Sequence, residues 1–146
     1  MKRLVSVVAV ICCGAMLALA SGDIDAAHQI TPEALAKTLQ SGKLPLILNV
    51  GPKLLYDQAH IRGAEYMGAA SSDDGLTKLR ERVKSLPKSA AIVMYCGCCP
   101  WEHCPNVRPA YAALHRMGFT NVKVMHVVQN IGTDWVDKGY PTEKGK

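Results

Sequence analysis

Short apolar runs and segments with helical spacing alternate along this chain. Three runs are largely apolar, as is typical of buried strands in a parallel sheet. They cover residues 44–50, 90–95 and 122–128. Three other segments place apolar side chains every three or four positions, which predicts amphipathic helices. They cover residues 31–42, 75–86 and 109–117. This alternation predicts one α/β domain built on a parallel sheet.

Local signals support the limits of these helices. Thr31 is followed by Pro32, the pair expected at an N-cap and the first helical position. Gly42 and Gly118 follow the first and third helical segments, where a glycine commonly ends a helix. The charged residues of the second segment are interpreted as its solvated face.

The N-terminal segment has the pattern of a secretory signal peptide. Lys2 and Arg3 precede a nearly unbroken apolar run over residues 4–19, and Ala18-Leu19-Ala20 is a small-x-small cleavage site. We expect cleavage after Ala20, export to the periplasm or the outside, and no stable membrane insertion afterwards. An uncleaved anchor is the alternative. We therefore expect a signal peptide at residues 1–20, a lead-in at 21–30 and the folded domain at 31–146.

Composition argues against a nucleic-acid partner. The 17 basic residues include Lys2 and Arg3, so 15 remain against 12 acidic residues, a net charge of about +3 after cleavage. This charge is too small to indicate a polyanionic partner, and no segment interleaves basic and aromatic residues. The 49% hydrophobic content is enough for a compact core.

Four cysteines of the expected mature chain lie in one loop directly after the apolar run at 90–95. They are Cys96, Cys98, Cys99 and Cys104, whereas Cys12 and Cys13 belong to the signal peptide. Cysteines this close together close no long loop, so they contribute little as a disulfide framework. The carboxyl end of a parallel strand is the usual place for a ligand site, and the start of the next helix favours a thiolate there. The cluster therefore indicates a site for thiol chemistry or ligand binding.

Several motifs in order resemble the rhodanese-like sulfurtransferase family. Residues 48–51 (Leu-Asn-Val-Gly) and 59–64 (Ala-His-Ile-Arg-Gly-Ala) match its first signature. Residues 92–96 (Ile-Val-Met-Tyr-Cys) match the strand that runs into the catalytic cysteine, and 135–141 contain the closing Trp-x-x-x-Gly-Tyr-Pro. The resemblance covers nearly all of the expected mature chain.

The resemblance implies one rhodanese-like domain with about five parallel strands and helices on both faces. It also implies that Cys96 takes a sulfane sulfur from a donor as a persulfide and passes it to a thiol acceptor, without a cofactor. Gly97, Cys98, Cys99 and Arg108 would then bind the substrate. His60 matches a histidine that orients a turn in this family.

The cysteine loop departs from the family pattern. The usual Cys-x-x-Gly-x-Arg is replaced by a longer segment, in which Asn106 falls at the arginine position and Arg108 is a nearby substitute. Asn49 and Gly51 replace the usual Asp and Arg of the first strand. An anionic donor such as thiosulfate therefore loses some of its usual positive partners.

The additional thiols allow two interpretations, which the sequence leaves open. In the first, Cys98, Cys99 or Cys104 resolves the persulfide on Cys96 as a disulfide. In the second, a soft-metal site for zinc or Cu(I) forms from thiolates and an imidazole. Its candidate ligands are Cys98, Cys99, His103 and Cys104. A catalytically silent interaction module is the remaining alternative.

Overall fold

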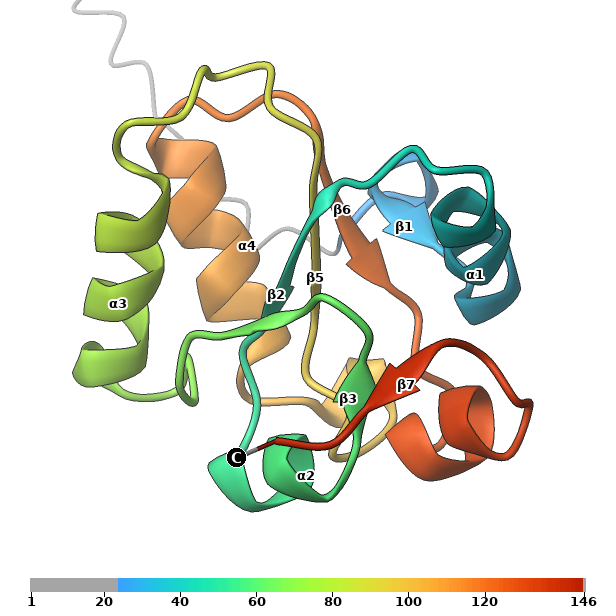
Figure 1. Ribbon diagram of the computed structural model, residues 1–146. Helices are drawn as coiled ribbons and strands as arrows, with labels where there is room; N and C mark the ends of the chain where they lie inside the picture. Colours follow the sequence, from blue (N-terminus) through green and yellow to red (C-terminus); the bar gives the residue numbers. More distant parts are fainter. Residues whose placement is uncertain (1–23, 146) are drawn as a thin grey trace, which may run out of the picture.

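The structure is a computed structural model that describes residues 24–145 (Figure 1). The expected signal peptide, residues 1–20, lies outside this range, as do the first three residues of the expected lead-in. Among residues 24–145, no helix is both long enough and apolar enough to cross a membrane.

A five-stranded parallel sheet forms the centre of the domain (Figure 1). Its strands in spatial order are β1 (Gln29–Ile30), β6 (Val122–Met125), β5 (Ile92–Tyr95), β2 (Leu46–Asn49) and β4 (Glu65–Tyr66). Leu46 of β2 and Val122 of β6 both pair with Ile92, so β5 is the middle strand. The expected parallel sheet is confirmed. The strands β2, β5 and β6 are shorter than the apolar runs because residues at one or both ends of each run lie outside the ladder.

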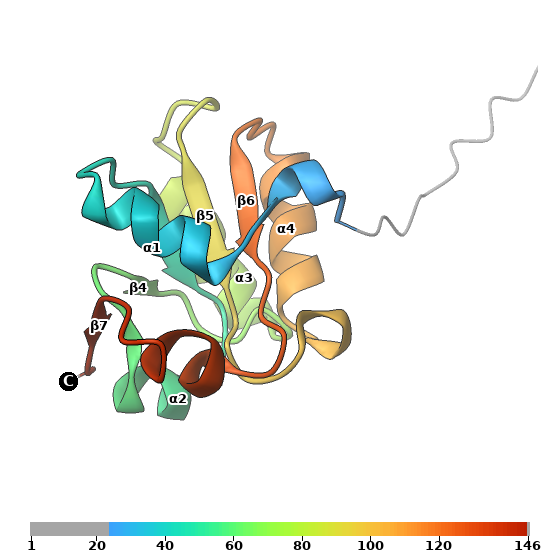
Figure 2. The same ribbon diagram turned by 90° about the vertical axis from the view of Figure 1, so that its right-hand side faces the viewer.

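Helices cover both faces of the sheet, as expected (Figure 2). The helices α3 (Asp73–Val83) and α4 (Val107–Arg116) pack on one face, where Met94 of β5 belongs to their core. On the other face, α1 (Pro32–Gln40) and the π-helical turn η3 (Gly132–Val136) pack over Val93. Successive residues of β5 thus point into different cores.

Side-chain caps set the starts of two helices. The Thr31 hydroxyl accepts a hydrogen bond from the Ala34 N–H at 3.1 Å, which confirms the expected N-cap. The Ser72 hydroxyl accepts one from the Gly75 N–H at 3.2 Å, so α3 begins at Asp73, before its first apolar position. Capping, and not apolar spacing, determines this start.

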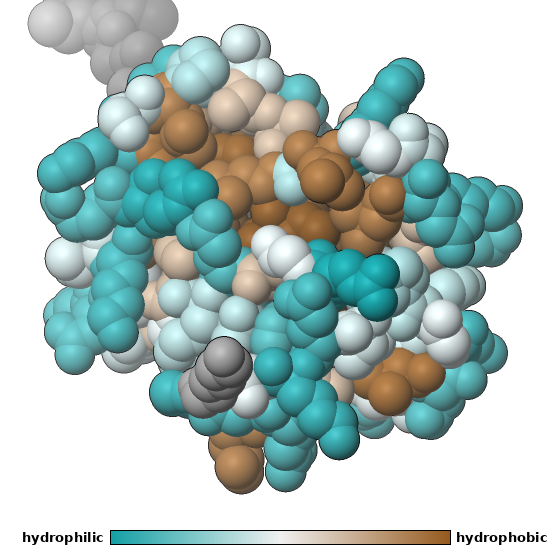
Figure 3. All heavy atoms as spheres, in the orientation of Figure 1, coloured by the Kyte–Doolittle hydropathy of each residue, from teal (hydrophilic) through white to brown (hydrophobic). Residues whose placement is uncertain are grey.

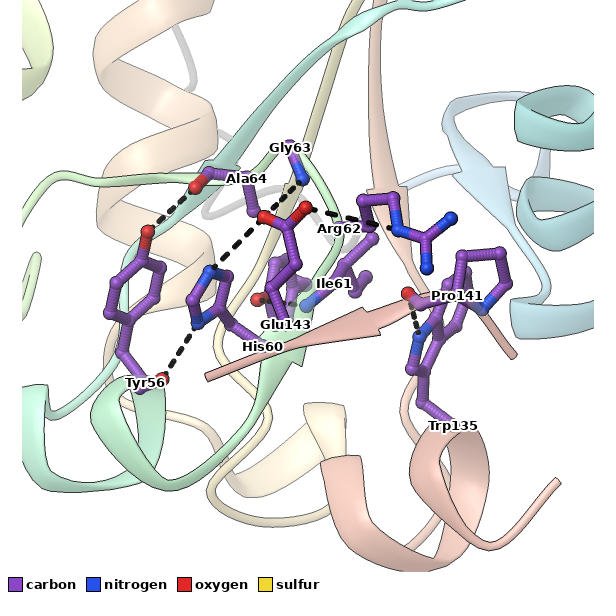
Figure 4. Close-up of polar contacts among 10 residues, drawn as sticks. Tyr56, His60, Ile61, Arg62, Gly63, Ala64, Trp135, Pro141 and Glu143 are labelled. Atoms are coloured by element: carbon purple, nitrogen blue, oxygen red, sulfur yellow. Dashed lines mark hydrogen bonds and ion pairs between the residues drawn. The ribbon is translucent and has the colours of Figure 1, made fainter. Parts of the chain in front are cut away.

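A second, two-stranded sheet ties the C-terminal segment to the domain. The strands β3 (His60–Ile61) and β7 (Thr142–Glu143) pair in antiparallel fashion next to α2 (Lys53–Gln58) (Figure 4). His60 is buried, donates from Nδ1 to the Tyr56 carbonyl at 2.9 Å and stacks on the Tyr56 ring at 3.8 Å. The Trp135 indole donates to the Pro141 carbonyl at 2.9 Å. His60 therefore has the structural role expected for it.

An apolar hollow lies where β2 and β5 begin, at the end of the sheet opposite to Cys96 (Figure 3). It has a volume of about 410 Å³ and includes the exposed side chain of Leu44. Its lining residues include no cysteine or histidine, and the cysteine loop lies at the other end, at the carboxyl ends of the strands.

Candidate active site

Cys96 directly follows the middle strand β5, and its side chain is only 3% exposed. The neighbouring strand β2 continues beside it, since the Val50 N–H donates to the Tyr95 carbonyl at 2.9 Å. Cys96 therefore lies at the carboxyl edge of the sheet, between the two strand ends where a ligand site is expected.

Asn49 and Gly51 shape the turn that receives Cys96. The Asn49 amide donates to the Cys96 carbonyl at 3.4 Å, and its oxygen accepts from the Gly51 N–H at 3.1 Å. A Cβ at position 51 would lie 2.4 Å from the Cys96 carbonyl oxygen and 3.0 Å from its sulfur. The glycine at this position is therefore required by the close approach of Cys96, which excludes an arginine.

Three sulfurs gather at the start of the loop. Cys96, Cys98 and Cys104 have their Sγ atoms within 4.8 Å of one another, and the Sγ atoms of Cys96 and Cys98 are 3.1 Å apart. Cys99 lies beside this group, 3.1 Å from the Cys98 sulfur. His103 is exposed and outside it. All four cysteines of the described chain are free thiols.

The spacing of the three sulfurs would suit a soft metal ion as well as thiol exchange. This donor set is not the one expected from the sequence, because Cys96 is in it whereas Cys99 and His103 are not. The short turn η2 (Trp101–His103) folds the loop back and buries Cys104 against Cys96, while His103 faces solvent.

Hydrogen bonds within the cluster favour a thiolate on Cys104. A hydrogen bond from the Cys96 thiol, together with those from the backbone N–H groups of Asn106 and Val107, lowers the pKa of Cys104 to about 6 against the effect of burial. The same hydrogen bond, with burial, raises the pKa of Cys96 well above its usual range. Burial, followed by a hydrogen bond to Cys98, raises the pKa of Cys99 to about 12.

Backbone N–H groups at the start of the next helix were expected to stabilise a thiolate on Cys96. In the structure, backbone N–H groups are shared between the sulfurs of Cys96 and Cys104. The Cys98 N–H points to Cys96, whereas two N–H groups at the start of α4 point to Cys104. The hydrogen bonds of the pair therefore favour the thiolate of Cys104 over that of Cys96.

Asn106 connects Cys96 to the start of α3. Its amide nitrogen donates to the Cys96 sulfur at 3.3 Å, and its oxygen accepts from the Ser71 N–H at 2.8 Å. The side chain is 3% exposed. Asn106 therefore supplies a neutral donor to the sulfur from the position where the family pattern has an arginine.

Arg108 contacts the cysteine loop itself. Its guanidinium donates to the Glu102 carbonyl at 2.7 Å and lies 5.5 Å from the centre of the Trp101 ring. These contacts brace the loop over the start of α4. The expected substrate contact of Arg108 stays a prediction.

A pocket of about 360 Å³ opens beside Gly97 and Cys98. Its other walls come from the segment around α2 and from η3, and include Leu55, Gln58, Ile131 and Val136. The Gly97 backbone is held there, because its carbonyl accepts from the Ile131 N–H at 2.9 Å. Cys98 is half-buried and lines the pocket, so it is a sulfur of the cluster that a small molecule can reach from this side.

The family model of the rhodanese-like domain matches residues 31–126, more than half of the chain. The chain belongs to the rhodanese-like family. Its Cys96 occupies the strand end that the family resemblance assigns to the catalytic cysteine. Among curated proteins, none matches the chain significantly.

Solved rhodanese-like structures share the fold. A rhodanese-like domain from Anabaena sp., determined by solution NMR, is 26% identical, with 80% of this chain and 79% of that one covered at a TM-score of 0.59. A protein from Bacillus halodurans is 19% identical, covers 80% of this chain and 77% of its own, and also has a TM-score of 0.59. At this lower identity the likeness shows the fold alone.

EanB, solved as a variant carrying a cysteine persulfide together with ergothioneine, is 25% identical at a TM-score of 0.59. The match covers 80% of this chain and 28% of EanB. The shared part is therefore a rhodanese-like domain within a larger protein.

Sequence reasoning located the cysteines of this rhodanese-like domain but not their surroundings. Asn49, Gly51 and Asn106 were visible only as departures from the family pattern, and their contacts with Cys96 explain all three. The departures were therefore the signal that these residues form the site.

Proposed function

We propose that this rhodanese-like domain is a sulfurtransferase in which Cys96 accepts a sulfane sulfur as a persulfide and passes it to a thiol acceptor. The observation that carries the proposal is the position of Cys96 at the end of the middle strand, with the Asn106 amide donating to its sulfur at 3.3 Å. The persulfide state of EanB supports this chemistry for a protein with a domain of this family.

The first step requires the Cys96 thiol to lose its proton, because only the thiolate attacks sulfur. The proton leaves to solvent, and the Asn106 amide together with the Cys98 N–H stabilises the resulting Cys96 thiolate. The Cys96 sulfur then forms a new S–S bond with the sulfane sulfur, and the donor's leaving group departs with the electron pair of the broken bond. The outer sulfur is transferred when an acceptor thiolate attacks it.

The choice of donor follows from the contacts of Arg108. Its guanidinium is hydrogen-bonded to the Glu102 carbonyl and lies over Trp101, while the neutral Asn106 contacts the Cys96 sulfur from the position of the family's arginine. Donors that depend less on an arginine at that position, such as polysulfide, suit the cluster better than thiosulfate. We further propose that residues 1–20 export the protein to the periplasm or outside, where sulfur donor and thiol acceptor meet it.

Intact mass spectrometry of protein purified without reductant, before and after exposure to thiosulfate or polysulfide, tests the function. We expect the sulfane sulfur of the donor to react with the wild type and not with Cys96→Ser. Cys99→Ser is the matched control, because its sulfur lies outside the group of three. Retention of one zinc or copper ion without sulfur uptake would instead establish the soft-metal alternative. If the protein takes up no sulfur and holds no metal, the interaction module is the interpretation that stands.

A further inference from the structure

Cys96 has a thiol partner inside the same chain. Cys104 is buried to the same extent, 3% exposed, and its sulfur is hydrogen-bonded to that of Cys96 within the group that spans 4.8 Å. A disulfide bond is about 2.05 Å long. The two sulfurs therefore need to approach by less than about 3 Å, a side-chain movement, to form one.

The other two cysteines are placed differently. Cys99 is outside the group of three and has a raised pKa, so it is a neutral thiol at pH 7. Cys98 is close to Cys96 but lines the pocket, and only Gly97 separates the two in the chain. Cys104 alone combines burial beside Cys96 with two backbone N–H donors that stabilise its thiolate. Such a thiolate is the attacking species in disulfide exchange.

We propose that Cys104 resolves the persulfide on Cys96, so that the domain converts sulfane sulfur into sulfide and stores the oxidation as a Cys96–Cys104 disulfide. This inference rests on the proposed persulfide chemistry of Cys96. It adds a reductive activity to sulfur transfer, with a dithiol as the second substrate.

The step balances in atoms and electrons. The Cys104 thiolate attacks the inner sulfur of the protonated persulfide, Cys96–S–SH. The persulfide S–S bond breaks, the S–S bond between the two cysteines forms, and the outer sulfur leaves with the electron pair as HS⁻. The sulfane sulfur gains the two electrons that the two thiols lose. An external dithiol then reduces the disulfide and is itself oxidised.

Burial favours this internal route over direct transfer. An acceptor in solution must reach the outer sulfur of a persulfide on a residue that is 3% exposed, whereas the Cys104 sulfur is already in contact with Cys96. Proximity of this kind raises the effective concentration of the attacking group. One sulfide per chain should therefore be released without any added acceptor, and turnover should require a dithiol.

The test follows an isotope-labelled sulfane sulfur through single turnover. Reduced, desalted protein is treated anaerobically with thiosulfate labelled in its outer sulfur, or with labelled polysulfide that is then removed by desalting. Intact mass, peptide mapping and released sulfide are measured for the wild type and for Cys96→Ser, Cys104→Ser, Cys104→Ala, Cys98→Ser and Cys99→Ser. Circular dichroism confirms that each variant is folded.

We expect the wild type to release one labelled sulfide and to lose two hydrogen atoms in a Cys96–Cys104 disulfide. Both Cys104 variants should still load, because the neighbouring group that raises the pKa of Cys96 is gone, and at the end point they should retain the labelled sulfur on Cys96. Cys98→Ser and Cys99→Ser should still release sulfide.

Three outcomes separate the possible failures. A stable persulfide in the wild type, identical to that in the Cys104 variants, would overturn the resolving role and leave sulfur transfer intact. Loss of sulfide release in Cys98→Ser or Cys99→Ser, with release retained in both Cys104 variants, would assign the role to that other cysteine and overturn the proposal. Absence of labelled sulfur from every protein, with no disulfide formed in the wild type, would refute the proposed function itself.

Discussion

Gly51 and Cys96 approach so closely that no side chain fits between them. A Cβ on Gly51 would lie 2.4 Å from the carbonyl oxygen of Cys96 and 3.0 Å from its sulfur. The two residues come from adjacent strand ends, and Asn49 holds both through its amide group. The position of the sulfur is therefore set partly by the absence of a side chain on the neighbouring strand.

Gly51→Ala should displace Cys96 without unfolding the domain. A methyl group forced into a packed site costs about 1–3 kcal/mol, and here the displaced atoms include the carbonyl and sulfur of Cys96. We expect a lower free energy of unfolding in denaturant titration together with strongly reduced sulfur uptake by mass spectrometry. Gly42→Ala is the control: it is strained by a φ of +77° but meets no atom within 4 Å. Equal sulfur uptake in both variants would contradict this account.

Two replacements of Asn106 should distinguish the effects of its two hydrogen bonds. Asn106→Asp keeps an oxygen for the Ser71 N–H but loses the donor to the Cys96 sulfur and places a carboxylate beside it. We expect slower sulfur uptake, because a negative charge opposes the Cys96 thiolate, and a lower free energy of unfolding, because the carboxylate is buried. Asn106→Leu also removes the acceptor and should cost about 1–3 kcal/mol in the free energy of unfolding. An Asn106→Asp variant that loads as fast as the wild type would refute the role of the amide donor.

Tyr95 links the small second sheet to the site. Its hydroxyl accepts from the Ile61 N–H at 3.1 Å and is hydrogen-bonded to the Asn49 side chain. Burial raises the pKa of Tyr95 well above the usual range, against the effect of these two hydrogen bonds. In Tyr95→Phe the Ile61 N–H loses its partner, at a cost of about 1–3 kcal/mol. Chemical denaturation measures this loss, and hydrogen exchange should show faster opening of β3. Unchanged exchange at Ile61 would show that the hydroxyl does not hold this strand.

The Glu65–Arg82 pair should make a small contribution to stability that depends on pH. Arg82 donates to the Glu65 carboxylate at 2.8 Å, and this hydrogen bond lowers the pKa of Glu65 against the effect of burial. Because the side chains are 41% and 36% exposed, the pair contributes at most about 1 kcal/mol. A lowered pKa in the folded state means that the contribution is present above the unfolded value and is lost as the pH falls.

Glu65→Gln should therefore be less stable than the wild type at neutral pH by up to about 1 kcal/mol. The difference should shrink as the pH falls below the ordinary glutamate pKa of 4.5 and disappear once Glu65 is protonated in the folded protein. Urea titrations at several pH values measure it. Glu33→Gln, in a more exposed pair with Lys37, is the control and should have a smaller effect. A difference that persists in acid would exclude the ion pair as its source.

The central strands and the long helices could be predicted from the sequence because burial imposes a period on them. Val93 and Met94, on opposite faces of β5, are both apolar since each face is covered. The two-residue strands β3, β4 and β7 are too short to show a period, and their pairing joins residues as distant as His60 and Glu143. Such pairings depend on the assembled fold.

The candidate site could be predicted only as a set of thiols. The sequence places Cys104 eight positions after Cys96, and nothing in that spacing indicates that η2 brings the two sulfurs together. The sequence also could not predict which cysteine favours the thiolate, because this depends on which backbone N–H groups at the start of α4 point to which sulfur. Asn106 could be placed by counting from Gly118, but its two partners required the structure.

The chain has only two tryptophans, and they lie in different parts of the molecule. Trp135 is buried beneath the C-terminal segment, whereas Trp101 lies within the cysteine loop, 5.0 Å from the His126 ring and next to the Arg108 guanidinium. A Trp135→Phe variant would therefore fluoresce from the loop alone. The intensity and wavelength of that single emission would report each change in the loop in real time, without any attached label.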